Sequence, residues 1–294
     1  MRRPTRAFTL IEMLVVVAVI SVLIAIMMPA LSLAKRQARQ AATASAIREL
    51  IQGYTLYHTE NDGALLLGYP PAYLNGQLLS VTLPTGQTIP GPGSFAGSLS
   101  ILRYPARMAP YENNVWKIMY QDSFMPSTPP LQGDTVAQAS AKAYQLSLFP
   151  SFGLNSTFLG GDFSEKGFTG TAPNYHLNMA GPALFRATQV QRPAQTLVFV
   201  ETAERNIAAG ITGGDRGLFR ATPPVAAGRQ WRAAAGRIQV VNQSADIGMP
   251  YSRSTGRIVV AFFDGHAEAM KPADLDDMRL WWPDATAPDQ DFVH

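Results

Sequence analysis

The sequence predicts an α+β protein in which one long N-terminal helix packs on an antiparallel β-sheet. Two observations carry this prediction. Residues 8–34 are almost entirely aliphatic, and a helical pattern of apolar residues continues to residue 60. The last third of the chain instead holds short runs of β-branched and aromatic residues bounded by Gly and Pro, which is typical of strands. We therefore expect one spine helix, followed by a head at 61–294 that contains the sheet and long loops.

The aliphatic segment is long enough to cross a membrane. From Phe8 to Ala34 it consists of Val, Ile, Leu, Met and Ala with a few hydroxyl side chains, and Glu12 is its only charged residue. As a helix this segment measures roughly 40 Å, against about 30 Å for the hydrocarbon layer of a bilayer. A charge inside such a helix costs about 2.5–3.5 kcal/mol on insertion scales, so Glu12 is expected to have a partner and a function.

The motif at 7–12 reads AFTLIE and resembles the N-terminus of type IV pilins and type II secretion pseudopilins, the class III signal family. The resemblance implies that a prepilin peptidase cuts between Ala7 and Phe8 and then N-methylates Phe8. It also implies that Glu12 compensates the Phe8 ammonium of a neighbouring subunit in a filament. Ala7 stands where the family most often has Gly, and it is still small enough to enter a protease site.

Pro29 adds to this resemblance, because it lies where family members carry a helix-kinking proline. A proline at this position removes the hydrogen bond to the Ala25 carbonyl and is expected to bend or locally melt the helix. The family likeness therefore covers residues 6–34. It implies other pilin or pseudopilin subunits, an inner-membrane assembly platform and the lipid bilayer as partners.

Other classes of N-terminal segment share a basic leader and an apolar core. A secretory signal peptide would be cleaved after Ala34, but the acidic Glu12 and the long core argue against it. Arg2 and Arg3 lie beside the initiator Met and leave no room for the n-region of a twin-arginine signal. An uncleaved single-pass anchor is the remaining alternative. The basic leader, followed by no further basic residue until Lys35, predicts a cytoplasmic N-terminus and an extracytoplasmic head.

Charge and cysteine content exclude several functions. The chain has 24 basic and 21 acidic residues, and the leader at 1–7 holds three of the arginines and no acid. Removing the leader leaves 21 basic residues, equal to the acidic ones, so no nucleic-acid-binding face is expected. The sequence has no Cys, which fits an extracytoplasmic protein without disulfides and excludes thiolate metal sites and Cys nucleophiles.

Beyond the aliphatic segment the helix becomes amphipathic over 35–60. Ile47, Leu50, Ile51 and Tyr54 recur at the spacing of one helical face, which predicts that this face packs on the head. The sequence ENDG at 60–63 predicts the end of the helix, with Gly63 in the left-handed conformation. We interpret His58 and its acidic neighbours as a solvated helix end rather than a metal cluster.

Residues 64–190 are rich in Gly, Pro, Ser and Asn. The stretch 83–97 predicts a long loop or a variable insertion, and 136–148 shows helical spacing of Ala and Gln. No cofactor is expected. A calcium site with oxygen ligands is a minor alternative, although no EF-hand-type loop is present. Its candidate residues are Gly160, Gly161, Asp162 and Glu165.

The C-terminal third predicts strands at 196–200, 237–241 and 257–263. Asp264-Gly265 follows the last of these and precedes another short run, so the pair predicts a hairpin with a type I′ turn, in which both residues have positive φ. Trp281 and Trp282 are expected to close the core of the head. An exposed partner patch is the alternative for these two tryptophans.

The segment FFDGH at 262–266 resembles the C-terminal signature of the H-X9-DG prepilin-like subgroup of Planctomycetes and related bacteria. Ser254 stands where that pattern has its His, so no role of the His transfers to this chain. Asp264, His266 and Glu268 also admit a catalytic or metal-binding interpretation, but a hairpin turn explains Asp264-Gly265 without it. His176 has no assigned role.

The sequence contains no Gly-x-Ser-x-Gly, His-Glu-x-x-His, phosphate-loop or dinucleotide motif, so no enzyme, catalytic residue or metal site is predicted. The predicted organisation is a leader at 1–7, an assembly and membrane half of the helix at 8–34, an amphipathic half at 35–60, and the head. The functional hypothesis is a prepilin-like filament subunit. The alternative is an anchored envelope protein with a ligand- or glycan-binding head that does not polymerise.

Overall fold

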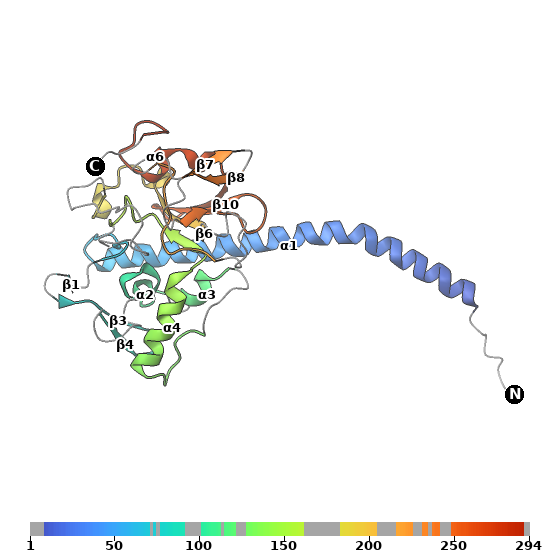
Figure 1. Cartoon of the computed structure of the whole chain (residues 1–294), viewed down its shortest axis with the longest axis horizontal. Helices are drawn as coiled ribbons and strands as arrows, with labels where there is room; N and C mark the ends of the chain where they lie inside the picture. The colour runs from blue at the N-terminus through green and yellow to red at the C-terminus, as the bar shows by residue number, and fades with distance from the viewer. Residues whose placement is uncertain are drawn as a thin grey trace.

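The computed structural model describes residues 9–70, 73–74, 77–91, 101–112, 115–121, 128–161, 183–204, 216–225, 231–234, 237–241 and 248–290. One long helix, α1, carries an α+β head on its C-terminal half, and its N-terminal half projects away from the head (Figure 1). The predicted fold class is confirmed.

Helix α1 runs unbroken over Leu10–Glu60. Thr9 is its N-cap and Asn61 its C-cap. Gly63 adopts the expected positive φ of 76°, and its N–H donates to the His58 carbonyl at 2.7 Å. This bond satisfies one of the carbonyls that a helix end leaves without an intrahelical partner, so the predicted helix stop is confirmed.

The C-terminal half of α1 lies in the core of the head. Ile47, Leu50, Ile51 and Tyr54 are all buried, as their spacing predicts. The first buried residue of the helix is Thr43, nine residues after the aliphatic segment ends. The amphipathic pattern therefore marks the part of α1 that the head covers.

An antiparallel sheet packs on one side of this half of α1. Its strands follow the order β11-β10-β6-β5, and β9 also pairs with β6. Val260 lies opposite Val200 on one side and Glu268 on the other, which places β10 in the interior of the sheet. The strands are β5 Phe152–Leu154, β6 Leu197–Glu204, β9 Gly248–Pro250, β10 Ile258–Phe262 and β11 Ala267–Met270.

Strand β10 is buried on both faces. Val259 and Ala261 belong to the same core cluster as α1, whereas Val260 and its alternate neighbours belong to a second cluster with Trp231 and Trp281. Trp282 stacks on Phe158 with ring centroids 5.7 Å apart. The two tryptophans at 281 and 282 thus pack in the head, and the prediction that they close its core is confirmed.

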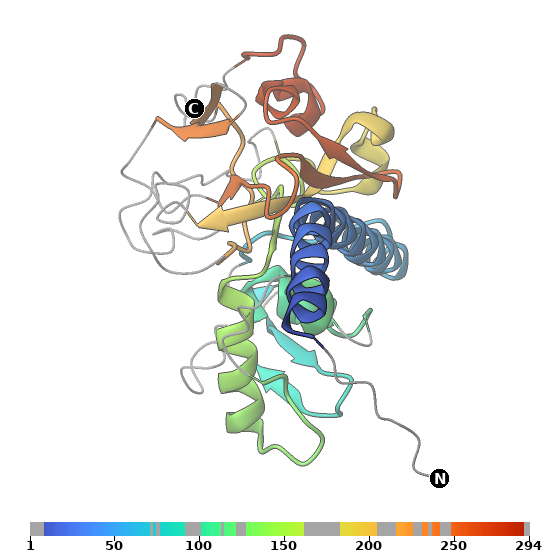
Figure 2. The same cartoon turned by 90° about the vertical axis from the view of Figure 1, so that its right-hand side faces the viewer.

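On its other side α1 meets a layer of short helices and a hairpin (Figure 2). The predicted helix at 136–148 is confirmed as α4, and Thr135 caps it in a capping box with Gln138. The elements of this layer are α2 Tyr104–Met108, α3 Val115–Met119, α4 Val136–Leu148, β3 Ser80–Thr82 and β4 Thr88–Pro90.

The long loop predicted for 83–97 is wrong in its first part. Strands β3 and β4 pair in antiparallel register, and the turn between them places Gly86 at a φ of 89°. The turn residues that suggested a loop therefore close a tight hairpin. Residues 92–97 lie outside the described residues.

The remaining described elements are short. Strands β7 and β8 form a separate two-stranded sheet, so the predicted strand at 237–241 is confirmed but does not join the main sheet. These elements are β1 Tyr73–Leu74, β2 Gln77–Leu78, β7 Trp231–Ala234, β8 Arg237–Val240, the 3₁₀ helices Ala187–Gln189, Pro193–Gln195 and Asp274–Asp276, and α6 Met278–Trp281.

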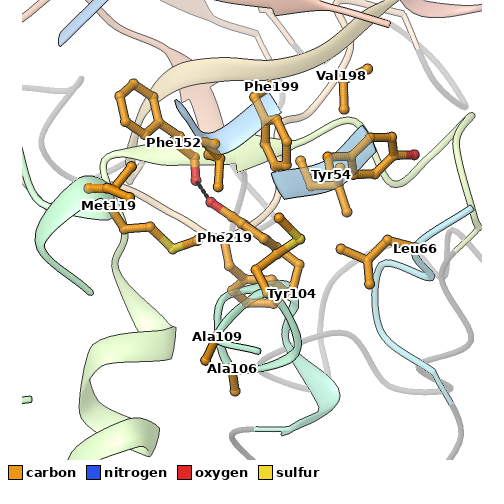
Figure 3. Close-up of a cluster of buried hydrophobic side chains, with 14 of the residues drawn as sticks. Tyr54, Leu66, Tyr104, Ala106, Ala109, Met119, Phe152, Val198, Phe199 and Phe219 are labelled. Carbon is orange, nitrogen blue, oxygen red and sulfur yellow. Dashed lines mark hydrogen bonds between the residues drawn. The ribbon is translucent and has the colours of Figure 1, made fainter. Parts of the chain in front are cut away.

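Phe199 of β6 joins the layers at the centre of the core (Figure 3). Its ring meets that of Tyr54 edge-on at 5.7 Å and that of Tyr104 at 5.3 Å. The Tyr104 hydroxyl donates a hydrogen bond of 2.6 Å to the Phe152 carbonyl. One side chain of the sheet thus contacts both α1 and α2, and aromatic pairs of this kind add to the stability gained from burial.

Glu112 is a carboxyl buried against α1. Its side chain packs over Gly53, the one position of this helical turn without a Cβ, and the residue is only 7% exposed. Burial raises the pKa of Glu112 to about 7, and the neighbouring Glu49 acts in the same direction. The carboxyl is therefore neutral at mildly acidic pH in the folded protein.

Glu112 should make the head less stable as the pH rises. An unfolded Glu ionises near 4.5, so the stabilising effect is complete below that pH and is lost as the pH rises through 7. The difference in unfolding free energy between E112Q and the unmodified protein should shift in favour of E112Q by on the order of 1–2 kcal/mol as the pH rises from about 5 to about 8. Urea unfolding of the full chain in detergent measures this difference. The exposed Glu60 supplies the control, E60Q, and an equal gain there would contradict the assignment.

Candidate functional site

The candidate functional site is the N-terminal half of α1, which the head does not cover. Its large apolar side chains, from Leu10 to Leu33, are 47% to 81% exposed. Its most apolar 18-residue window has a mean hydropathy of 3.0, and none of that window is buried. Among the described residues, α1 is the one helix long and apolar enough to cross a membrane. Such a surface needs a cover of lipid or protein.

The few hydroxyl groups on this half of α1 already have partners within the helix. Ser21 Oγ donates to the Val17 carbonyl and Ser32 Oγ to the Pro29 carbonyl, each at 2.8 Å. In hydrocarbon every polar group must be satisfied from within the protein. These two serines therefore suit an apolar environment, a feature that the sequence analysis did not anticipate.

Pro29 lies inside α1 without interrupting it. The projecting half of the helix curves away from the axis of the half that lies in the head (Figure 1). Of the two expected effects of Pro29, a bend agrees with this shape, whereas local melting does not occur in the structure. The hydrogen bonds on either side of a single missing bond are enough to keep a helix continuous.

Glu12 has a partner within its own chain. One carboxylate oxygen accepts hydrogen bonds from the Thr9 backbone N–H at 2.8 Å and from the Thr9 hydroxyl at 2.9 Å. The Glu12 N–H in turn donates to Thr9 Oγ1 at 3.2 Å. This reciprocal capping box satisfies two donors at the start of α1, where a negative charge is also favoured by the helix dipole. Ala7 and Phe8 lie outside the described residues.

A family model described as the prokaryotic N-terminal methylation motif matches residues 2–28. The chain carries a prepilin-type N-terminal motif. The matched range contains Glu12 and the expected cleavage site between Ala7 and Phe8, and it ends one residue before Pro29. No curated protein and no solved structure matches the chain. The motif therefore bears on processing and on the exposed helix, while the subgroup likeness at 262–266 stays a prediction.

Asp264 and Gly265 lie in the turn between β10 and β11. Gly265 has a φ of 95°, but Asp264 is not among the described residues with positive φ, so the expected type I′ turn is wrong. The Gly265 N–H donates to the Phe262 carbonyl at 3.0 Å, and the Phe262 N–H donates to the His266 carbonyl at 2.9 Å. These bonds close a three-residue loop in which only the last residue is left-handed.

The candidate set Asp264, His266 and Glu268 does not form one site. His266 Nδ1 lies 2.5 Å from Asp264 Oδ1, and its ring stacks on Phe262 at 4.3 Å. Glu268 is exposed on β11, and the hydrogen bonds described for His266 go to Asp264 and not to Glu268. Within the described ranges, no three His, Asp or Glu side chains gather as metal ligands would. The contact between His266 and Asp264 is therefore a local feature of the turn.

The other candidate residues are only partly described. Gly160 and Gly161 have φ values of 80° and 71°, and Gly160 packs against the backbone of Leu66. Asp162, Glu165 and His176 lie outside the described residues. Close packing against backbone thus accounts for Gly160, whereas Gly161 faces the side chains of Phe185 and Ala183. The calcium hypothesis stays a prediction.

The sequence analysis missed a buried ion pair on strand β6. Glu201 on β6 is 1% exposed, and its carboxylate lies 3.6 Å from the Arg253 guanidinium. The same carboxylate accepts from the backbone N–H groups of Arg253 and Val259, each at 3.2 Å. Burial raises the pKa of Glu201, and Arg253 opposes that rise. The pair ties the segment next to Ser254 to the central strand.

Replacing Arg253 with Met should destabilise the head by about 3–5 kcal/mol, because the buried Glu201 carboxylate would lose its countercharge. Denaturant unfolding measures this loss. R257M is the matched control, since Arg257 is exposed and, within the described residues, its guanidinium donates to the Ala269 carbonyl and not to a carboxylate. If both variants lost the same small amount of unfolding free energy, Arg253 would not be neutralising Glu201.

Proposed function

We propose that this chain is a prepilin-like structural subunit. In this proposal a prepilin peptidase cuts between Ala7 and Phe8 and N-methylates Phe8, and α1 then assembles into a type IV pilus or a type II secretion pseudopilus-like filament. The observation that carries the proposal is the methylation motif at 2–28, of which residues 10–28 lie on a helix half that is entirely exposed in the single chain. The head contributes no catalytic step.

The exposed half of α1 fits two successive environments. In a bilayer, lipid tails would cover its apolar side chains, and in a filament the same side chains would pack on helices of other subunits. The internally bonded Ser21 and Ser32 suit both, because neither environment supplies water. We place the chain in the inner membrane as a single-pass protein, with its head on the extracytoplasmic side.

Glu12 connects processing with assembly. The cut would create an ammonium group at Phe8, next to the Thr9 that holds the Glu12 carboxylate in the capping box. In a bundle of helices, the carboxylate could exchange Thr9 for the ammonium of a neighbouring subunit. A buried pair of opposite charges tolerates little displacement, so the exchange would fix the axial register between subunits.

The cut would also change the charge balance across the membrane. Arg2, Arg3 and Arg6 flank the apolar half on one side, and three basic residues at 35–39 flank it on the other. Cleavage removes the first set and leaves the second. Basic flanks resist transfer across a membrane, so leader removal would ease movement of the N-terminal end toward the head side.

The first test is the mass of the mature N-terminus. Mass spectrometry of the protein from its native membrane should find a chain that begins at Phe8 and carries one extra methyl group. A chain that begins at Lys35 would overturn the proposal in favour of a secreted protein. An intact leader would instead support the permanent anchor with a ligand- or glycan-binding head.

The second test removes the charge at residue 12. E12L should reduce the filament fraction by about tenfold or more, because a close charge pair between proteins contributes at least about 1.5 kcal/mol. The amount of processed subunit in the membrane should stay unchanged. E60L makes the same substitution at an exposed site at the other end of α1 and should assemble normally. Undiminished filaments with E12L would exclude the register role of Glu12.

A further inference from the structure

Three basic residues follow directly on the apolar half of α1. Lys35, Arg36 and Arg39 are exposed, and we call residues 35–39 the basic neck. None of the three forms an ion pair with any residue in the described part of the chain. The sequence has no acidic residue between Glu12 and Glu49, so the neck has no countercharge along its own helix.

The positions of these charges on the helix call for an external anion. Residues 35, 36 and 39 fall within about 100° of arc, because successive residues turn by that angle. Like charges three and four residues apart destabilise a helix, whereas an acidic residue four positions earlier would relieve them. Those positions hold Leu31, Ser32 and Lys35 instead.

The neck lies at the level where a bilayer would end. Glu12 and Lys35 are 23 residues apart, which corresponds to about 35 Å of helix, against about 30 Å of hydrocarbon. Both charges can therefore reach the polar boundaries of a bilayer while the apolar residues between them fill its interior. Moderate tilt or the curvature of α1 absorbs the small excess in length.

The head begins immediately beyond the neck. Gln40 Oε1 accepts a hydrogen bond of 2.9 Å from the Thr255 hydroxyl, and Thr43 is the first buried residue of α1. The neck thus lies between the apolar half and the head, and neither covers it (Figure 1). No acidic residue in the described part of the chain pairs with these three side chains, whereas a membrane surface at this level would supply groups of opposite charge to all of them.

We propose that the basic neck binds the phosphate groups of anionic phospholipids in the leaflet that faces the head. This inference rests on the membrane placement of α1 and not on filament assembly. The bound lipids hold α1 at one depth, with Glu12 at the opposite boundary. They also make departure of the helix from the bilayer sensitive to salt and to lipid charge.

The test measures which lipids surround the neck. Because the chain has no Cys, a single donor dye can be attached at Q37C. The full-length protein is placed in vesicles of phosphatidylcholine with about 30% phosphatidylglycerol, and energy transfer is recorded to an acceptor carried by either lipid. We expect phosphatidylglycerol to be enriched about fivefold or more near the label, and molar salt to abolish the enrichment.

Two double variants, each with two positive charges removed, test whether the enrichment depends on the neck or only on the total charge of the protein. K35Q/R36Q should lower the enrichment several-fold, whereas R232Q/K271Q alters one exposed Arg and one exposed Lys of the head and should leave it unchanged. Equal transfer to both lipids in the unmodified protein would overturn the proposal. An equal loss in both double variants would do the same.

An alkaline wash of the vesicles tests the membrane placement of α1 separately from the lipid preference of the neck. A chain that stays with the membrane but shows no preference for phosphatidylglycerol overturns the neck proposal and leaves the membrane placement intact. A chain that the wash releases overturns the membrane placement, and the neck proposal with it. Retention together with the preference supports both.

Discussion

The structure depends on one constraint: α1 is a single unbroken helix whose two halves need different surroundings. From Thr43 to Tyr54 the helix supplies the centre of a folded core, whereas from Leu10 to Leu33 it exposes apolar side chains that no part of the described head covers. The halves cannot separate without breaking backbone hydrogen bonds near residues 35–42. A force or a depth imposed on one half is therefore transmitted to the other, and the head follows wherever the apolar half is held.

The head is arranged to grip that helix from two sides. The sheet contacts α1 through Val259, Ala261 and Phe199, while α2 and α3 contact it from the opposite side. Each side also buries a carboxyl group: Glu112 lies against α1 itself, and Glu201 lies on β6 beside Arg253. Buried carboxyls seldom raise stability, because desolvation costs about as much as pairing returns. The Glu201–Arg253 pair favours one arrangement, since any shift would leave one of its two charges without a partner.

The sequence predicted what depends on local periodicity and missed what depends on distant contacts. Ile47, Leu50 and Tyr54 define the packed face of α1 because helical spacing alone places them together, and the runs at 196–200 and 257–263 are strands for a similar reason. The hairpin β3–β4 was missed because the Pro and Gly of a tight turn look the same as those of a long loop. The turn at Asp264 was assigned the wrong type, because turn type depends on which residues pair across the strands. Arg253 could not be linked to Glu201, because 52 positions separate them in the sequence. The one signal in the sequence was an acidic residue within a strand that was expected to be buried.

The two ends of the apolar half pose one electrostatic problem under the proposed function. For α1 to leave a bilayer toward the head side, Glu12 must cross about 30 Å of hydrocarbon, and a bare carboxylate there costs about 2.5–3.5 kcal/mol even on insertion scales. The capping bonds from Thr9 lessen this cost but leave the charge in place. An ammonium from an adjacent subunit removes the net charge, so the interaction that would set the register is also the one that would make passage possible. The basic neck has the opposite energetic effect, because departure separates its charges from the lipid phosphates. Assembly would thus gain a charge pair at one end of the span while losing lipid contacts at the other, and the balance depends on the lipid composition of the membrane.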